Sequence, residues 1–204
     1  MSTSATPTLD ALDHAGRSLL FTEARTANTF ADIPVTDEEL VGIWELAKWA
    51  PTSANLQPLR VLFVNSAEGR QRLVGHMSEG NRAKTLSAPA VAVLAIDSRF
   101  HEHAPTVMPF MPQLKDIFES NEDARTSSAR LNSALQAGYF VLAVRAQGLA
   151  AGPMTGFDAD AIDADFFPDG RLHAFMVVNL GHPGEDAFRN RLPRLDASQV
   201  VDWA

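Results

Sequence analysis

Apolar residues recur at helical spacing in several segments of the chain. The clearest case follows Thr36 and Glu39, which form a capping box, and it is predicted to end before Pro51 because a residue that precedes proline avoids helical backbone angles. The longest case carries small and apolar residues on more than one face, which predicts a central helix with Gly148 at its C-terminal end. The helices predicted in this way span residues 9–25, 36–50, 68–76, 127–147 and 158–166.

Three short apolar runs predict β-strands, at residues 60–65, 90–97 and 173–180. The second run is apolar at successive positions, which is typical of a strand buried on both faces. Helices and strands are interspersed without a change in composition, so residues 9–204 are predicted to form one domain of the α/β or α+β class. Residues 1–8 are small and polar and are predicted to be a disordered tail.

Residues 101–121 form the least regular stretch, with three prolines among apolar side chains such as Phe110 and Met111. One interpretation is an ordinary surface excursion that packs on itself. The other is a lid or the wall of a substrate pocket, because long irregular segments of compact domains are often functional. The sequence leaves both interpretations open.

The composition narrows the classes of protein. The 204 residues include 17 lysines and arginines, 25 aspartates and glutamates and no cysteine, for a net charge of −8. An acidic chain argues against a general nucleic-acid binder, and the lack of cysteine excludes disulfides, thiolate metal sites and iron–sulfur clusters. No signal-peptide pattern starts the chain, and no apolar run reaches the roughly 18 residues of a membrane span. We therefore expect a cytoplasmic protein with no membrane or nucleic-acid partner.

The common nucleotide motifs are absent, since neither a G-x-G-x-x-G sequence after a strand nor a P-loop occurs. The run His101-Glu102-His103 has no third ligand in view, so we interpret it as a solvated turn and expect no metal site. The aspartates between Asp158 and Asp169 are interpreted as a capped, solvated helix face rather than as a paired-carboxylate site.

Positive side chains gather near the two ends of the chain. Arg25 lies beside Thr26 just after a predicted helix, and Arg189, Arg191 and Arg194 fall within six residues. Arginines of this kind either balance acidic neighbours at the surface or grip a phosphate, to which a guanidinium group donates two parallel hydrogen bonds. Taken alone, the C-terminal cluster favours the surface interpretation.

Two loops are rich in small and polar residues. Residues 51–58 join a predicted helix to a predicted strand, and residues 152–156 follow the longest predicted helix. Hydroxyl and amide groups in the first loop could hydrogen-bond the polar edge of a planar heterocycle, and glycines in the second would let the backbone approach a ring closely. Each loop by itself is more simply interpreted as an ordinary turn.

Together these segments resemble the FMN-dependent nitroreductase family, in the family's order, from about Phe21 to Val200. The resemblance rests on five motifs: ARTANTF, WAPTSANLQP, NRAK at residues 81–84, GPMTGF, and RNRLP at residues 189–193. It implies an α+β fold with a central, mainly antiparallel sheet flanked by helices, assembled as an intertwined homodimer. It also implies bound FMN and transient NAD(P)H, with the FMN sites at the subunit interface.

The resemblance gives each motif a part in the FMN site. The basic residues near both chain ends would grip the phosphate, Asn81 would bond the pyrimidine edge of the ring, and Lys84 would support the negative charge of the reduced ring. The loop at residues 51–55 would reach the FMN of the partner subunit. Hydride would pass from NAD(P)H to flavin N5 and then to the substrate, so no side chain is assigned as catalytic. The implied cofactor-binding residues are Arg25, Thr26, Asn28, Pro51, Thr52, Ser53, Asn55, Asn81, Lys84, Pro153, Met154, Thr155, Gly156, Arg189 and Arg191.

Within the family, the stretches EARTANTF, KWAPTSAN, GLAAGPMTGFDADAIDADFF and RLPRL are most similar to the malonic semialdehyde reductase branch of pyrimidine degradation. This similarity implies reduction of malonic semialdehyde to 3-hydroxypropionate, although such a likeness transfers fold and cofactor better than substrate. A broad nitroreductase or quinone reductase, and a flavin-binding protein without this turnover, remain as alternatives. Asn28 and Thr155 depart from the family pattern, in which many members have a basic residue and a glutamate.

Overall fold

The computed structural model describes residues 9–204, so the predicted tail at residues 1–8 lies outside the described residues. Within this range the strands are β1 (Leu59–Val64), β2 (Ala90–Asp97), β3 (Ala150–Met154) and β4 (Leu172–Gly181). The α-helices are α1 (His14–Arg17), α2 (Asp37–Ala47), α3 (Ala67–His76), α4 (Glu79–Ser87), α5 (Ala104–Val107), α6 (Leu114–Ser120), α7 (Glu122–Ala146), α8 (Ala159–Phe166) and α9 (Ala197–Val200). A π-helical turn, η1 (Ser18–Thr22), and two 3₁₀ turns, η2 (Ser53–Asn55) and η3 (Phe100–His103), connect them.

All neighbouring strands of the sheet are antiparallel, in the order β1-β2-β4-β3. β1 begins beside the end of β2, because Leu59 pairs with Ile96 and Val64 pairs with Val91. This arrangement confirms the predicted antiparallel sheet. It also places the segment before β1 and the segment before β2 at opposite ends of that strand pair.

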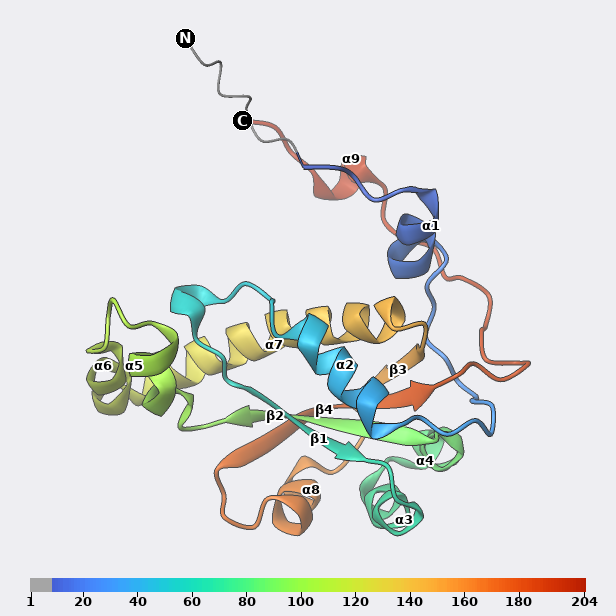
Figure 1. The fold of residues 1–204 in the computed structure, drawn as a ribbon, viewed down its shortest axis with the longest axis horizontal. Helices are drawn as coiled ribbons and strands as arrows, with labels where there is room; N and C mark the ends of the chain where they lie inside the picture. Colours follow the sequence, from blue (N-terminus) through green and yellow to red (C-terminus); the bar gives the residue numbers. More distant parts are fainter. Residues whose placement is uncertain (1–8) are drawn as a thin grey trace.

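Helices cover both faces of the sheet (Figure 1). α2 and α7 lie on one face, where Ile43 and Phe140 belong to a buried apolar cluster. α3, α4 and α8 lie on the other face, where Leu73 and Ile162 belong to a second cluster. The apolar surface that these two layers remove from water, at about 25 cal/mol per Å², stabilises the sandwich.

Local sequence signals are confirmed at three helices. The Thr36 hydroxyl accepts a hydrogen bond from the Glu39 amide at 3.2 Å, and the Glu39 carboxylate accepts one from the Thr36 amide at 2.8 Å. Asp158 caps α8 by accepting from the Ala161 amide at 3.0 Å. Gly148 follows α7 with a φ of 76°, a left-handed conformation that glycine adopts without steric cost.

The sequence pattern misses β3 and α4. β3 contains Gly152, Pro153 and Met154, which were expected in a loop, so that expectation is wrong. Small residues and a proline carry no strand signal, and Pro153 is tolerated because β3 lies at the edge of the sheet and pairs on one side alone. α4 is mostly polar and buries only Thr85 completely, so its apolar periodicity is too weak to predict a helix.

Two predicted helix boundaries are wrong. Residues 9–25 form only the short α1 and the turn η1, in which no side chain is buried, so tertiary packing does not extend the helix. α7 begins at Glu122 rather than at residue 127. Its true start is set by Asn121, whose side chain accepts a hydrogen bond from the Ala124 amide at 3.0 Å.

Residues 101–121 are less irregular than expected, because they fold into η3, α5 and α6. His101 is buried, and its Nε2 lies 2.7 Å from the Glu119 carboxylate of α6. The prediction of a solvated turn is therefore wrong for His101, which packs against Phe100 and ties η3 to α6.

The solvated face predicted for the α8 aspartates is also wrong in part. Asp163 accepts a hydrogen bond from the Ala174 amide of β4 at 2.7 Å, and Asp165 pairs with Arg72 at 2.6 Å and with His76 at 3.0 Å. These carboxylates fasten α8 to β4 and α3.

Both ends of the described chain extend away from the sheet (Figure 1). We call residues 9–22 the N-terminal arm and residues 188–204 the C-terminal arm. Their exposed large apolar side chains are Leu9, Leu12, Leu19, Phe21, Phe188, Leu192, Leu195, Val200, Val201 and Trp203. The arms therefore present apolar surface that the chain does not cover itself.

Candidate functional site

Residues predicted from three separate motifs meet at one polar cavity. The cavity has a volume of about 490 Å³ and is lined by Asn28, Lys84 and Arg189. Thr29, Gly80, Ala83, Ser87 and Asp186 complete its lining. The fold thus brings the segments around Asn28 and Arg189, far apart in the sequence, to α4.

The segment that carries Asn28 is held between β3 and the start of the C-terminal region. The Asn28 amide donates to the Ala187 carbonyl at 2.9 Å, and the Ala27 amide donates to the Ala151 carbonyl at 3.1 Å. A Cβ on Gly152 would lie 2.9 Å from the Ala27 carbonyl oxygen, so this close approach requires glycine. The backbone beside the cavity is therefore fixed on both sides.

The arginines near the two chain ends lie side by side. Arg25 donates to the Arg189 carbonyl at 3.4 Å and lies 5.7 Å from the centre of the Phe188 ring, and Arg191 donates to the Ala24 carbonyl at 3.2 Å. Among residues 9–204, the buried Nε of Arg25 has no hydrogen-bond partner. Buried donors are rarely left without an acceptor, so this nitrogen is available to an anionic group.

α4 presents Asn81 and Lys84 on one face, because they are three residues apart. The Asn81 side chain donates to the Gly156 carbonyl at 2.7 Å, and the Ser78 amide donates to the same oxygen at 3.1 Å. A Cβ on Gly156 would lie 2.6 Å from the Asn81 amide nitrogen. The loop after β3 is therefore fixed against α4, close to Lys84.

Lys84 and Arg189 outweigh the one carboxylate of the lining, Asp186, so the net charge of the cavity favours a negatively charged ligand. Burial lowers the pKa of Lys84 below its ordinary value, and the positive charge of Arg189 lowers it further. Two neighbouring cations raise the free energy of the free site, and an anion would offset that cost and raise the pKa of Lys84 again.

The other predicted contact loop lies far from this cavity. Pro51, Thr52, Ser53 and Asn55 precede β1, whereas Lys84 precedes β2, and the two strands run antiparallel. A strand rises about 3.4 Å per residue, so the 8 residues of β2 separate the two groups by roughly 25 Å. Figure 1 shows the loop at the α5 and α6 end of the molecule and α4 at the other end. One chain does not bring them together.

The remaining predicted residues fall into two groups. Met154 is buried, and its side chain belongs to an apolar cluster of the core, whereas Pro153 is partly buried. Thr155 and Thr26 are exposed, and the Thr26 carbonyl accepts a hydrogen bond from the Asn28 side chain at 3.3 Å. The side-chain amide of Asn28 thus forms hydrogen bonds with the backbone.

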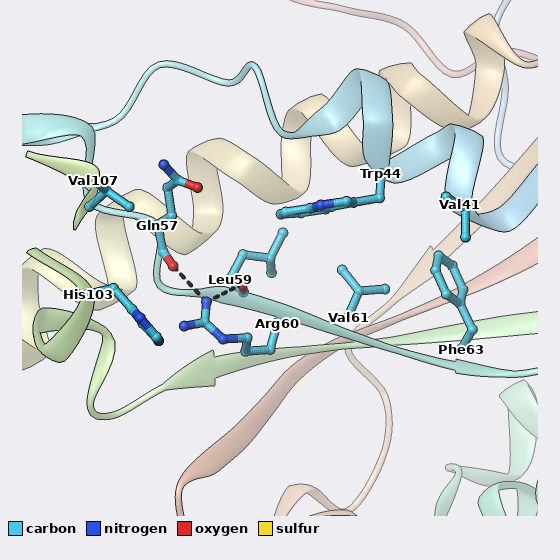
Figure 2. A pocket seen from close by; sticks show the side chains of 9 residues that line it. All are labelled: Val41, Trp44, Gln57, Leu59, Arg60, Val61, Phe63, His103 and Val107. Atoms are coloured by element: carbon cyan, nitrogen blue, oxygen red, sulfur yellow. Dashed lines mark hydrogen bonds between the residues drawn. The ribbon is translucent and has the colours of Figure 1, made fainter.

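A larger cavity of about 560 Å³ lies between α2 and β1 and contains no predicted cofactor residue (Figure 2). Val41 and Trp44 of α2 face Val61 and Phe63 of β1. Gln57, Arg60, His103 and Val107 lie at one end, and Leu59 completes the lining. This space is mostly apolar and borders the unpaired edge of β1.

Sequence reasoning misses a buried carboxylate at the end of β2. Asp97 lies 2.6 Å from Arg60 and accepts two bonds from Arg171, at 2.8 and 3.0 Å. Burial raises the pKa of Asp97, but the bonds from Arg171 and the Arg99 amide and the two arginine charges outweigh it, so the pKa lies below its ordinary value. The only signal of Asp97 in the sequence is that a charged residue stands at the end of an apolar strand.

Two further observations concern the described part of the chain. Across residues 9–204, no group of three or more histidine, aspartate or glutamate side chains is placed to hold a metal ion. Within the same residues, every helix is too short or too polar to cross a lipid bilayer.

Comparisons with known sequences bear on this geometry. The family model described as Nitroreductase family matches residues 22–182. A Streptomyces coelicolor protein named "Putative NADH dehydrogenase/NAD(P)H nitroreductase" is 57% identical over 185 residues, which cover 91% of this chain and 92% of that protein. A Leptothrix cholodnii protein of the same name is 50% identical over 186 residues, which cover 91% and 94%.

Solved structures share the fold at lower sequence identity. A structure titled as a putative nitroreductase from Bacillus subtilis superposes with a TM-score of 0.84 at 24% identity, covering 94% of this chain and all of that one. A structure from Exiguobacterium sibiricum, titled as a putative nitroreductase in complex with FMN, has a TM-score of 0.83 at 22% identity and covers 97% and 100%. The predicted fold class is confirmed.

Proposed function

Because the chain belongs to the nitroreductase family, we propose that it binds FMN and uses NAD(P)H to reduce malonic semialdehyde to 3-hydroxypropionate. The main support for FMN binding is the cavity that Asn28, Lys84 and Arg189 line together. The neighbouring positive charges, and the Nε of Arg25 that has no hydrogen-bond partner within residues 9–204, fit a ligand that bears a phosphate.

Each part of the cavity has a task in this proposal. Arg25, Arg189 and Arg191 bind the phosphate, with the Thr26 hydroxyl beside them. Asn81, which follows the lining residue Gly80, holds the edge of the ring together with Gly156, since their mutual hydrogen bond fixes the loop after β3 against α4. FMN, when bound, supplies the two-electron carrier between NAD(P)H and an acceptor. Lys84 provides the positive charge that favours the reduced, negatively charged form.

The working unit in this proposal is a homodimer. Pro51, Thr52, Ser53 and Asn55 lie too far from Lys84 to share a site within one chain, so they complete the cavity of a second copy. α7 supports this, because Leu131, Leu135 and Tyr139 form an exposed apolar stripe with exposures of 58%, 43% and 42%. A stripe of this kind on a stable helix marks a surface that another chain covers.

The arms fit the same assembly. β1 has one unpaired edge, and the apolar cavity of Figure 2 lies beside it. An open strand edge with an apolar groove suits an extended segment of another chain. The C-terminal arm, with Val200, Val201 and Trp203 exposed, is such a segment. The absence of cysteine and the acidic charge agree with a cytoplasmic enzyme that has no nucleic-acid or membrane partner.

The proposed substrate rests on the sequence stretches similar to the malonic semialdehyde reductase branch. A broad nitroreductase or quinone reductase is the second candidate. It is favoured by Phe110 and Met111, exposed apolar residues of the segment that joins α5 to α6. Figure 1 shows these two helices at the same end of the molecule as the loop before β1. In the dimer the two residues would lie on the substrate side, where apolar surface suits flat aromatic acceptors.

The cofactor proposal is tested by the visible spectrum of the purified protein and by titration of the stripped protein with FMN. We expect a flavin spectrum that NADH or NADPH bleaches without oxygen. Protein that lacks flavin and does not bind added FMN contradicts the cofactor, and flavin that no nicotinamide bleaches favours a binding protein without turnover.

The substrate is tested by steady-state rates on the flavin-loaded enzyme. We expect kcat/KM for malonic semialdehyde to exceed kcat/KM for a nitroaromatic and for a quinone. A clearly higher value for either aromatic acceptor would establish the second candidate instead.

A further inference from the structure

The loop that precedes β1 has a strained backbone. Ala54 has φ 52° and ψ 32°, and Asn55 has φ 53°, so two consecutive non-glycine residues adopt left-handed angles. Such angles bring the Cβ close to a backbone oxygen and persist only where surrounding contacts impose them. The contacts that impose them come from three different elements.

α7 supplies the first of these contacts through two buried amides. Asn132 is 0% exposed, and its side-chain oxygen accepts a hydrogen bond from the Ser53 amide at 2.8 Å. Gln136 is 1% exposed, and its side-chain oxygen accepts from the Leu59 amide at 3.1 Å. The two residues are four apart and therefore share one face of the helix. Together they hold both ends of the loop.

Two other side chains fix the middle of the loop. Arg60 of β1 donates to the Gln57 carbonyl at 2.8 Å (Figure 2). Asn55 donates to the Val107 carbonyl of α5 at 2.6 Å, which joins the loop to the segment at residues 101–121. The loop is thus rigid before any ligand binds.

Burying a side-chain amide costs free energy unless the amide forms hydrogen bonds, and an apolar residue at the same position would not have this cost. Gln136 buries a side-chain nitrogen that has no partner among residues 9–204, so it is an expensive way to fill the core. What Asn132 and Gln136 provide, and leucine would not, is an acceptor for a loop amide. We therefore interpret the two amides as groups that fix the shape of the loop rather than as groups that improve the packing of α7.

We propose that Asn132 and Gln136 are positioning residues that hold the loop at residues 52–59 in the shape that completes the FMN site of the partner chain. This inference rests on the proposed function above. α7 also carries the exposed stripe that faces the second copy in the proposed dimer. The buried face of the same helix then holds a loop that belongs to the FMN site of the partner chain.

The first test measures FMN affinity. Asn132→Leu keeps the number and branching of the side-chain heavy atoms but removes the acceptor, so we expect the dissociation constant of FMN to rise about tenfold, the effect of one lost hydrogen bond. Gln136→Leu is a second variant with the same expected direction. Titration of the stripped protein, followed by flavin fluorescence, gives each value.

Ser133→Ala is the matched control. Ser133 is 0% exposed on the same helix, and its hydroxyl has no partner among the described residues, so this change should leave FMN affinity unaltered. Thermal unfolding is recorded for each variant. Leucine variants that unfold at lower temperature but bind FMN as the unchanged protein does would assign the amides a purely structural role and overturn the inference.

The second test uses mixed dimers. Chains with Asn132→Leu are co-expressed with chains that carry Lys84→Met, and the doubly tagged mixed dimer is purified. If Asn132 acts on the partner's site, one site of the mixed dimer is intact and its flavin content exceeds that of both parent dimers. If Asn132 acts within its own chain, both sites are defective and no recovery occurs.

The two proposals fail in different ways. An unchanged protein that does not bind FMN contradicts the proposed function. An unchanged protein that binds FMN, together with mixed dimers that recover nothing, contradicts the inference alone.

Discussion

Charge at single positions decides what the cavity can bind. Lys84 and Arg189 line the same space, and burial and mutual repulsion lower the pKa of Lys84. An anionic cofactor would relieve that repulsion, and a cofactor that gains negative charge on reduction would relieve it further. Lys84 therefore links affinity to reduction potential.

We predict that Lys84→Met weakens FMN binding about tenfold and makes the reduction potential of the bound flavin more negative by roughly 30–60 mV, since 30 mV of a two-electron couple corresponds to about 1.4 kcal/mol. Spectroelectrochemical titration measures the potential. Arg82→Met, which removes a charge from the same helix outside the cavity lining, should change neither quantity. An unchanged potential in Lys84→Met would rule out the role of Lys84.

Asp97 gives a prediction about stability and pH. Its pKa in the folded chain lies below the ordinary value of 3.8, so the folded state takes up its proton later than the unfolded state as the pH falls. Its stabilising contribution is complete well above pH 3.8 and is lost as the pH falls toward the folded pKa. Because Arg60 and Arg171 stay about a third exposed, we expect Asp97→Asn to cost about 2–3 kcal/mol at pH 7.

Urea unfolding at pH 7 and at pH 3 measures this effect. The difference between Asp97→Asn and the unchanged protein should shrink at pH 3. Glu185→Gln, at an exposed carboxylate, should lose little stability at either pH. An equal difference at both values would show that the charge of Asp97 is irrelevant.

Residues differ in how far the sequence predicts them. Arg25, Lys84 and Arg189 stand in short motifs and can be selected before the fold is known. Asp97 and Asn132 cannot, because a buried polar side chain gains its meaning from partners far along the chain, here Arg171 and Ser53. The apolar periodicity shows only that such a residue interrupts an apolar face. It does not indicate which group the residue binds.

Among the elements, β3 depends on a glycine, Gly152, for its contact with the segment that carries Asn28. Gly152→Val would place side-chain atoms where a Cβ alone already lies 2.9 Å from the Ala27 carbonyl oxygen. We expect a loss of about 2 kcal/mol of stability, as for overpacked cores, and weaker FMN binding because the segment with Arg25 shifts. Urea unfolding and FMN titration measure the two effects.

Gly75→Ala is the control for this change. A Cβ on Gly75 of α3 meets nothing within 4 Å, so alanine should raise stability by up to about 1 kcal/mol through its helix propensity. Full stability in Gly152→Val would show that the backbone near Ala27 can move aside.

Elements are predictable from sequence where the local signal and the packing agree. β2 spans the predicted residues because it is apolar throughout, and the cap at Asp158 sets the start of α8. α4 is stabilised instead by contacts such as that of Asn81 with Gly156. The helix that carries two predicted cofactor residues is therefore invisible to an apolar pattern.

At the scale of the whole molecule, the exposed stripe on α7 predicts the assembly. Leu135→Glu would bury a charge at the centre of the proposed interface, so we expect a monomer that has lost bound FMN. Sedimentation and the visible spectrum measure both outcomes. Gln71→Glu adds the same charge on α3, beyond the opposite face of the sheet, and should leave the dimer intact. A Leu135→Glu dimer that keeps its flavin would place the interface elsewhere.

The two-chain site is the part of the prediction that depended wholly on family resemblance. Net charge and periodicity describe one chain, and nothing in them separates the loop before β1 from Lys84. The antiparallel register of β1 and β2 does so physically, since Leu59 lies beside Ile96.

In the proposed dimer, that separation links FMN binding to the concentration of subunits. If each chain carries two half-sites and no complete one, FMN binds the paired form in preference to the single chain and draws chains together by mass action. Dilution would then release flavin even though no residue has changed. When FMN is scarce, more of the protein would exist as single chains. Such chains lack a complete site, and their exposed apolar arms favour aggregation.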